Sequence, residues 1–344
     1  MIHLPGREMN PGWHQQEDKM LTRRTLMLSA AAAPLAGLTG QVASAQSRSF
    51  FGIATGGTGG TYYPLGGMLA QLISNTAELP GTKLSATAET GNASVANTKL
   101  LSRGEIESAF AAADILDAAY KGTGQFEDGK VENIRAIGAL YPETVQLVVR
   151  ADSGIEKFED LVGKSISSGS PGSGQWQLLG DLIEAHGMSR EDVSEDYSSF
   201  SQSVEKIKDG NLDASLITAG APTSSVTELA NGHEIRIVPL TGPAIAKLQE
   251  TQPYYVSSIL PAGSYKGVDA EVETLAVRAI WATHADVPED IIYAVTKALY
   301  ENTETLGKVH PKGREIAAAT ALQSVSIPVH PGAAKYYQEI GVGQ

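Results

Sequence analysis

The hydrophobic positions along this chain alternate between the period of a strand and the period of a helix. A short apolar run at residues 51–54 predicts a buried strand, and a loop of glycines and threonines follows it. Beyond the loop, apolar residues recur at the spacing of one helix face. These residues are Leu65, Met68, Leu69, Leu72 and Ile73.

The same order of strand, polar loop and helix returns along the rest of the chain. We expect further strands at residues 83–88, 107–112, 144–150, 212–218 and 235–239, and a return strand at 254–259. We expect helices at residues 93–103, around 178–183, at 201–209, up to 230, at 288–302 and at 313–322. Strands and helices that alternate at these lengths predict parallel α/β sheets.

Two glycine loops stand between a strand and a helix, at residues 55–61 and 168–174. Glycine lets backbone N–H groups approach a ligand, and the first turn of a helix has unpaired donors with a partial positive charge. Parallel sheets bind ligands at the carboxyl ends of their strands, so two such loops in separate units predict two lobes facing across a cleft. The alternative for the first loop is a plain strand-to-helix turn.

Neither loop matches a nucleotide or nucleophile motif. The first loop is not followed by the Gly-Lys-Ser/Thr of a phosphate loop and does not have the glycine spacing of a dinucleotide fold. The second offers the hydroxyls of Ser170 and Ser173, but Pro171 stands where a nucleophile elbow would have its serine. The alternative for Ser173 is a helix N-cap, because capping and ligand binding use the same unpaired donors.

Other candidate residues lie beside the predicted cleft. Glu89 and Asp114 come just after strands, where a ligand could reach them, and helix capping is the alternative for both. Tyrosine combines apolar cover with a hydroxyl, although some tyrosines will simply be core. Those in or beside the cleft and its crossovers are Tyr62, Tyr63, Tyr141, Tyr254 and Tyr255. The histidines are scattered, with no spacing that indicates a metal site, and we expect no metal and no cofactor.

The first 45 residues have the pattern of an export signal. Residues 22–28 resemble a twin-arginine motif, an alanine-rich stretch follows, and Ala-Ser-Ala at 43–45 has the form of a cleavage site. A membrane anchor is the alternative, but polar residues, glycines and Pro34 interrupt the apolar run. Acidic residues before Met20 fit a signal poorly, so Met20 is a candidate for the true start. We therefore expect a signal peptide at 1–45 and a periplasmic protein.

Charge and cysteine content narrow the classes of partner. The net charge of the 344-residue chain is −13, which argues against nucleic acid or an anionic membrane surface as partner. A small anion is compatible with this charge, because a few oriented amides can act locally. The chain has no cysteine, so disulfides, thiolate metal sites and a thiol nucleophile are excluded.

Seven stretches, spread over nearly the whole chain after the signal, resemble the TAXI-family solute receptors, which are the binding components of TRAP-type transporters. They are Ala-Thr-Gly-Gly-Thr-Gly-Gly-Thr-Tyr-Tyr-Pro-Leu at 54–65, Glu-Thr-Gly-Asn at 89–92, Leu-Tyr-Pro-Glu at 140–143, Ser-Pro-Gly-Ser-Gly at 170–174, Ala-Gly-Ala-Pro at 219–222, Pro-Ala-Gly-Ser-Tyr at 261–265 and Pro-Val-His-Pro-Gly-Ala at 328–333.

The resemblance implies a two-lobed periplasmic binding protein fold, type II-like, in which each lobe is a mainly parallel sheet flanked by helices. Lobe 1 would comprise residues 46–141 plus 256–344, and lobe 2 residues 142–255. Two crossover segments, near 141–144 and 253–257, would act as hinges. The receptor would be a monomer without enzymatic activity that delivers its ligand to a membrane permease driven by an ion gradient.

The resemblance also implies a ligand class and a set of contacts. Known ligands of the family are amino acids such as glutamate and dicarboxylates such as 2-oxoglutarate. Many relatives have threonine after the Ser-Pro-Gly-Ser-Gly run, whereas this chain has Gln175 and then Trp176, which would reshape the pocket. The implied ligand contacts are Thr58, Thr61, Tyr62, Asn92, Tyr141, Ser170, Ser173, Gly174, Ala219 and Gly220.

Two alternatives to a receptor for transport stay open on the sequence. A periplasmic enzyme on a similar fold could use Ser170 or Ser173, but the sequence does not place the activating base that it needs. A sensor subunit could report the ligand to a membrane kinase. Candidates for the basic residue that neutralises a carboxylate are Arg150 and Arg278.

Overall fold

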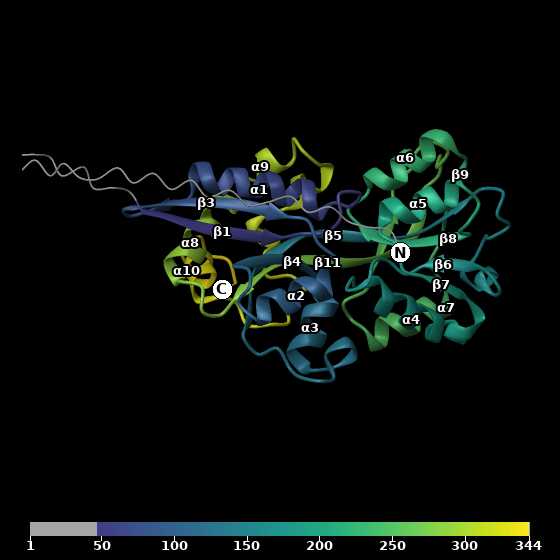
Figure 1. Ribbon diagram of the computed structural model, residues 1–344, viewed down its shortest axis with the longest axis horizontal. Helices are drawn as coiled ribbons and strands as arrows, with labels where there is room; N and C mark the ends of the chain where they lie inside the picture. Colours follow the sequence, from purple (N-terminus) through teal and green to yellow (C-terminus); the bar gives the residue numbers. More distant parts are fainter. Residues whose placement is uncertain (1–46, 344) are drawn as a thin grey trace, which may run out of the picture. The chain divides into compact units, whose positions relative to one another are not determined.

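Parallel strands at both ends of one sheet are joined through long antiparallel strands at its centre (Figure 1). The computed structural model describes residues 47–343, and the predicted signal peptide lies outside these residues. The strand order is β2-β3-β1-β4-β11-β5-β8-β6-β7, with β10 paired to β11 and β9 paired to β5. The sheet therefore combines two parallel groups, β3-β1-β4 and β8-β6-β7.

The strands of the first parallel group and its edge are β1 (Ser47–Ala54), β2 (Glu78–Leu79), β3 (Thr82–Glu89) and β4 (Ser108–Ala112). Those around the second group are β6 (Ser165–Ser167), β7 (Ser194–Asp196), β8 (Ala214–Ala219) and β9 (Ile235–Val238). The connecting strands are β5 (Ile134–Arg150), β10 (Val256–Leu260) and β11 (Val272–His284). β5 changes its antiparallel partner from β11 to β8 at Thr144.

Helices cover both faces of this sheet. One face packs against α2 (Ser94–Ser102), α3 (Ala113–Lys121), α4 (Gln175–Ala185) and α7 (Pro243–Thr251). The other packs against α1 (Tyr62–Thr76), α8 (Glu289–Tyr300) and α10 (Pro331–Glu339) in one part, and α5 (Phe200–Lys208) and α6 (Ser224–Gly232) in another. Burying both sheet faces explains why β4, β5 and β8 are apolar runs rather than alternating ones.

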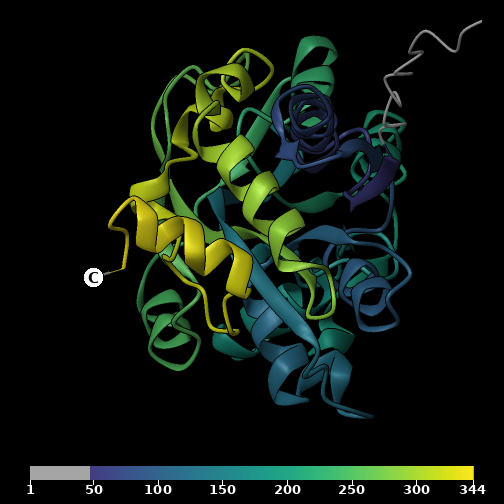
Figure 2. The same cartoon turned by 90° about the vertical axis from the view of Figure 1, so that its left-hand side faces the viewer.

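The C-terminal helices form a layer over the first parallel group. α8 and α10 lie side by side (Figure 2), and the ring of Tyr336 in α10 packs on Tyr293 and Tyr300 of α8. A short helix, α9 (Thr303–Leu306), follows α8. The single-turn 3-10 helices are η1 (Gly124–Phe126), η2 (Phe158–Leu161), η3 (Arg190–Asp192), η4 (Pro311–Glu315) and η5 (Ala318–Thr320).

The α/β class and the helices that flank the sheet are confirmed, and several element predictions are wrong. The helix expected at 313–322 is two 3-10 turns, and the strand expected to begin at Thr144 begins at Ile134. The return strand expected at 254–259 is β10, which pairs only with β11; it is β11, missed in the sequence, that pairs with β4. α7 and α10 were also missed. The division into lobes at residues 141/142 and 255/256 stays a prediction.

Candidate ligand-binding site

Both glycine loops border a single cavity of about 220 Å³. The first glycine loop, residues 55–61, connects β1 to α1, and the second, residues 168–174, connects β6 to α4. Ala112 at the end of β4, Asp114 at the start of α3 and the end of β8 also line the cavity. All four strands belong to the parallel groups and reach the cavity with their carboxyl ends, which is where α/β sheets bind ligands.

The structure brings most of the predicted contact residues together in this cavity. Tyr141 and Gly220 are the exceptions, since neither lines it. The Tyr141 side chain is fully buried in the core between the sheet and α1. Gly220 lies just outside, where its carbonyl accepts a hydrogen bond from the Thr61 hydroxyl. Those that line the cavity are Thr58, Thr61, Tyr62, Asn92, Ser170, Ser173, Gly174 and Ala219.

Two polar groups of the first glycine loop, the Thr61 hydroxyl and the Gly59 carbonyl, make hydrogen bonds with residues 220–225, which follow β8. The Thr61 hydroxyl donates to the Gly220 carbonyl at 2.9 Å. The Gly59 carbonyl accepts from the Ser224 hydroxyl at 3.0 Å and from the Ser225 amide at 3.2 Å. An added Cβ on Gly59 would lie 2.5 Å from the Ser201 hydroxyl oxygen, so this close approach requires glycine. The first loop therefore ties the two parts of the sheet together.

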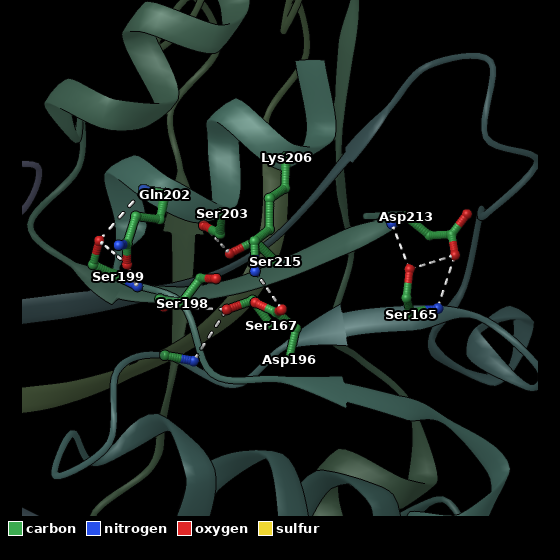
Figure 3. A network of polar contacts seen from close by, with 11 residues as sticks. Ser165, Ser167, Asp196, Ser198, Ser199, Gln202, Ser203, Lys206, Asp213 and Ser215 are labelled. Carbon is green, nitrogen blue, oxygen red and sulfur yellow. Dashed lines mark hydrogen bonds and ion pairs between the residues drawn. The ribbon is translucent and has the colours of Figure 1, made fainter. Parts of the chain in front are cut away.

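The second glycine loop rests on a polar network at the ends of β6 and β7 (Figure 3). The Ser167 hydroxyl donates to the Ser198 carbonyl at 3.2 Å and accepts from the Gly169 amide at 3.4 Å. Nearby, the Lys206 ammonium pairs with the Asp196 carboxylate at 2.5 Å. The Ser167 contacts hold the start of the loop, whereas Ser170, Ser173 and Gly174 line the cavity.

Ser173 in this loop is not a helix cap. The N-cap of α4 is Gly174, which makes no side-chain capping bond. The Ser173 side chain is 5% exposed, and its hydroxyl has no hydrogen-bond partner in the described structure. A buried hydroxyl without a partner is unfavourable unless something else binds it.

Two carboxyl groups face the cavity. Glu143 on β5 is 4% exposed, and one of its oxygens accepts a 2.7 Å hydrogen bond from the Tyr62 hydroxyl. Burial raises the pKa of Glu143 to about 8, the Tyr62 hydrogen bond lowers it and the charge of Asp114 raises it. Burial also raises the pKa of Asp114 to about 6, against a lowering by the 2.8 Å hydrogen bond from Tyr255.

No basic side chain lines the cavity among residues 47–343. The two arginines considered for neutralising a carboxylate lie elsewhere. Arg150 pairs with Asp152 beside it in the chain, and Arg278 donates to the Gln323 side chain. An anionic group in this cavity would therefore be stabilised by loop amides and hydroxyls alone, opposite two acidic residues.

Several lining residues were missed in the sequence, and Tyr63, Glu89, Tyr254 and Tyr255, which were expected in or beside the cleft, do not line the cavity. Glu89 does not line it, and only its carbonyl contacts the first loop, as the acceptor of the Thr55 amide and hydroxyl. Of the missed residues, Gly91 and Glu143 stood inside recognised motifs, Glu-Thr-Gly-Asn and Leu-Tyr-Pro-Glu. The other missed residues include Ser199, Phe200, Ser201, Thr218 and Val277, which reach the cavity through folding rather than through a local pattern.

The described residues contain neither a metal-binding cluster nor a membrane-spanning helix. No cluster of three or more His, Cys, Asp or Glu side chains within residues 47–343 has the arrangement of a metal site. In the same part of the chain, no helix has the length and apolar character needed to cross a membrane.

Comparison with solved structures supports the fold. A protein of Bordetella bronchiseptica RB50 matches with a TM-score of 0.54 at 15% identity, over 85% of this chain and 98% of that one. The periplasmic aliphatic sulphonate binding protein SsuA of Escherichia coli matches with a TM-score of 0.47 at 16% identity, over 85% and 83% of the two chains. A putative L-cystine ABC transporter protein of Listeria monocytogenes gives 0.46 at 15% identity, over 79% and 98%.

The family of this chain is shown by a family model, and not by these distant structural similarities. The model of the NMT1-like family matches residues 53–341, which include both glycine loops and the carboxyl ends of the four strands that border the cavity. Because this match spans well over half of the chain, the protein belongs to the NMT1-like family.

Proposed function

We propose that this protein is a periplasmic solute receptor that encloses a small carboxylate, either a glutamate-like amino acid or a dicarboxylate such as 2-oxoglutarate. The observation that carries the proposal is the single cavity between two glycine loops from separate parallel groups. Its volume of about 220 Å³ suits a small metabolite. Loop amides and the hydroxyls of Ser170 and Ser173 would bind the carboxylate.

Lobe movement would control access to this cavity. The contacts of Thr61 with Gly220 and of Gly59 with Ser224 would form when the lobes close and break when they open. The strands β5 and β11 would bend near residue 144, where β5 changes partner. Predicted export behind the signal at residues 1–45 and the resemblance to binding proteins favour a receptor over the enzyme and the kinase-linked sensor.

A thermal-shift screen tests the receptor proposal. Purified protein without its signal would be heated with glutamate, glutamine, 2-oxoglutarate and C4 dicarboxylates. A ligand present at about 100 times its dissociation constant stabilises the folded state by about 2.7 kcal/mol. No shift with any compound would contradict the carboxylate assignment, and chemical turnover of a stabilising compound would contradict the receptor assignment.

The transport partner needs a separate experiment. We propose a TRAP-type permease, on the resemblance of the seven sequence stretches to TAXI receptors. Uptake of the identified ligand into vesicles that contain the permease should depend on this protein and on an ion gradient, and should not need ATP. Uptake that requires ATP hydrolysis would instead indicate an ABC-type partner, which is the kind named for several proteins of similar fold.

A further inference from the structure

We propose that the cavity holds an ammonium group at a site formed by Asp114, Glu143 and Gln175, so that the ligand is an amino acid rather than a dicarboxylate. This inference rests on the proposed receptor function and narrows its ligand class. It depends on which hydrogen-bonding atoms of the cavity wall lack a partner.

Two residues of the cavity wall carry acceptor oxygens without a hydrogen-bond partner in the described structure. Asp114 Oδ1 is one of them, whereas Asp114 Oδ2 accepts from the Tyr255 hydroxyl at 2.8 Å. Gln175 is 8% exposed, and its Nε2 donates to the Thr218 carbonyl at 3.4 Å. This bond leaves Gln175 Oε1 buried in the cavity wall without a donor. The two atoms lie on different helices, α3 and α4, so their shared lack of a donor is not a local accident of the chain.

An ammonium group fits these acceptor oxygens better than any anion does. It offers three donors and no acceptor, which matches carboxylate oxygens and an amide oxygen. No lysine, arginine or histidine lines the cavity in the described part of the chain, so a dicarboxylate would place two negative charges beside two acidic residues without a counter-charge. An amino acid separates its charges, with its carboxylate at the glycine loops and its ammonium group at the acidic side.

Gln175 supplies the amide part of the site. It stands directly after the second glycine loop, as the first residue of α4. Its side chain presents a carbonyl oxygen as well as an N–H group. The Ser173 and Thr218 hydroxyls, also buried and without partners, lie in the same wall and can accept or donate.

Binding of paired compounds tests the proposal directly. Calorimetry would compare each common L-amino acid with the acid that lacks its amino group, for example glutamate with glutarate and aspartate with succinate. We expect at least one amino acid to bind and its deaminated partner to bind at least about 30-fold more weakly, as for loss of one partner of a buried charge pair. A deaminated acid that binds as tightly as its amino acid would overturn the ammonium site while leaving the receptor function intact.

Two further outcomes separate this inference from the receptor proposal. If no compound of either set binds, the proposed carboxylate receptor fails and the ammonium site fails with it. If a diamine such as putrescine binds and no carboxylate does, the ammonium site stands and the carboxylate part of the proposed function is wrong.

A matched pair of variants locates the site on Asp114. Asp114→Asn keeps the hydrogen bond from Tyr255 possible but removes the charge, and should weaken the amino acid at least about 30-fold without weakening its deaminated partner. Asp117→Asn is the control, since Asp117 lies on the same helix but pairs with Lys121 outside the cavity. Equal weakening by both variants, or none by Asp114→Asn, would overturn the assignment.

Proton exchange gives a second readout that needs no variant. At pH 7 the Glu143 carboxyl, with a pKa of about 8, holds a proton, and a cation bound beside it favours the charged form. The groups that face Glu143 are Tyr62, Tyr141 and Asp114, and those that face Asp114 are Tyr255 and Asp181. Calorimetry in buffers of different ionisation enthalpy should detect proton release on binding. Proton uptake, which an added negative charge would cause, would overturn the proposal.

Discussion

The two glycine loops look alike in sequence and differ in what they do. Both connect a parallel strand to a helix, and both border the same cavity. In the first loop, the Thr61 hydroxyl and the Gly59 carbonyl are occupied by contacts with residues 220–225. In the second, the Ser173 hydroxyl has no partner in the described residues. A glycine-rich loop can therefore serve mainly to join two parts of a fold or mainly to present free groups to a ligand.

The difference has a physical origin in what each loop packs against. The first loop approaches Ser201 and Ser225 so closely that only glycine fits at Gly59, and its polar groups are satisfied by that approach. The second loop is held at its start by the Ser167 hydroxyl and neighbouring residues. The Ser173 hydroxyl thus remains available to bind a ligand.

The first test uses pH, because the helix after the first loop is anchored to an ionisable group whose pKa is raised by burial. The Tyr62 hydroxyl donates to Glu143, whose pKa is raised by burial from 4.5 to about 8. The unfolded chain loses this proton near pH 4.5, so the stability that it contributes is present below that pH and falls as pH rises toward 8. The slope is at most about 1.4 kcal/mol per pH unit for one proton.

Unfolding by urea across pH 4.5 to 8 measures this slope. Glu143→Gln should flatten it, since the amide does not titrate in this range. Asp114→Asn is the comparison, with a smaller effect in a lower window because the pKa of Asp114 is raised only to about 6. An unchanged slope in Glu143→Gln would show that the carboxyl is not buried as described.

The second test adds one carbon to the first loop. Gly59→Ala would push a methyl group against Ser201, and overpacking of this kind costs about 1–3 kcal/mol. We expect lower unfolding free energy and weaker ligand binding, because the same contact would hold the closed lobes. Gly57→Ala is the control, as no heavy atom lies within 4 Å of an added Cβ there. Equal effects of the two substitutions would contradict the close approach.

The third test removes one hydrogen bond from the first loop. Thr61→Val keeps the shape of the side chain and loses the bond to the Gly220 carbonyl, which should lower the unfolding free energy by about 1 kcal/mol. Thermal unfolding without ligand measures this effect. A variant as stable as the unmodified protein would indicate that water or another group replaces the hydroxyl at no cost.

The fourth test removes the free hydroxyl of the second loop. Ser173→Ala should not lower the unfolding free energy, because it removes a buried hydroxyl that has no protein partner, and should weaken ligand binding by about tenfold. Ser199→Ala is the matched control, since Ser199 accepts from the Gln202 amide as the cap of α5 and should lose about 1 kcal/mol of stability. Equal loss of stability in the two variants would restore the capping role for Ser173.

Much of the fold could be predicted from local patterns. The helix that contains Leu65 and Leu69, the strand at 83–88 and both glycine loops follow from the spacing of apolar residues and from glycine, whose effects act over a few residues. The strands β5 and β11 were harder to predict from the sequence. β5 continues through Pro142, which was expected to precede the strand, and β11 has no glycine or proline to mark its place between turns.

The site was only partly predictable for the same reason. Motif resemblance identified residues of both loops, whereas Ser201, Thr218 and Val277 are distant in sequence and meet only when the two parallel groups fold against each other. Tyr141 was misplaced because alternation along a strand does not say which face is core until neighbouring helices are positioned.

Local periodicity and composition were enough to predict the α/β class, the two glycine loops and the absence of cysteine chemistry. The folded structure was needed to show that Thr61 bonds to Gly220 while the Ser173 hydroxyl has no partner among the described residues. It was also needed to show that two carboxyls line the cavity with no described basic side chain in its wall. Hydrogen bonding and charge balance depend on which distant groups come within a few ångströms of each other. The packing of the folded chain sets those distances.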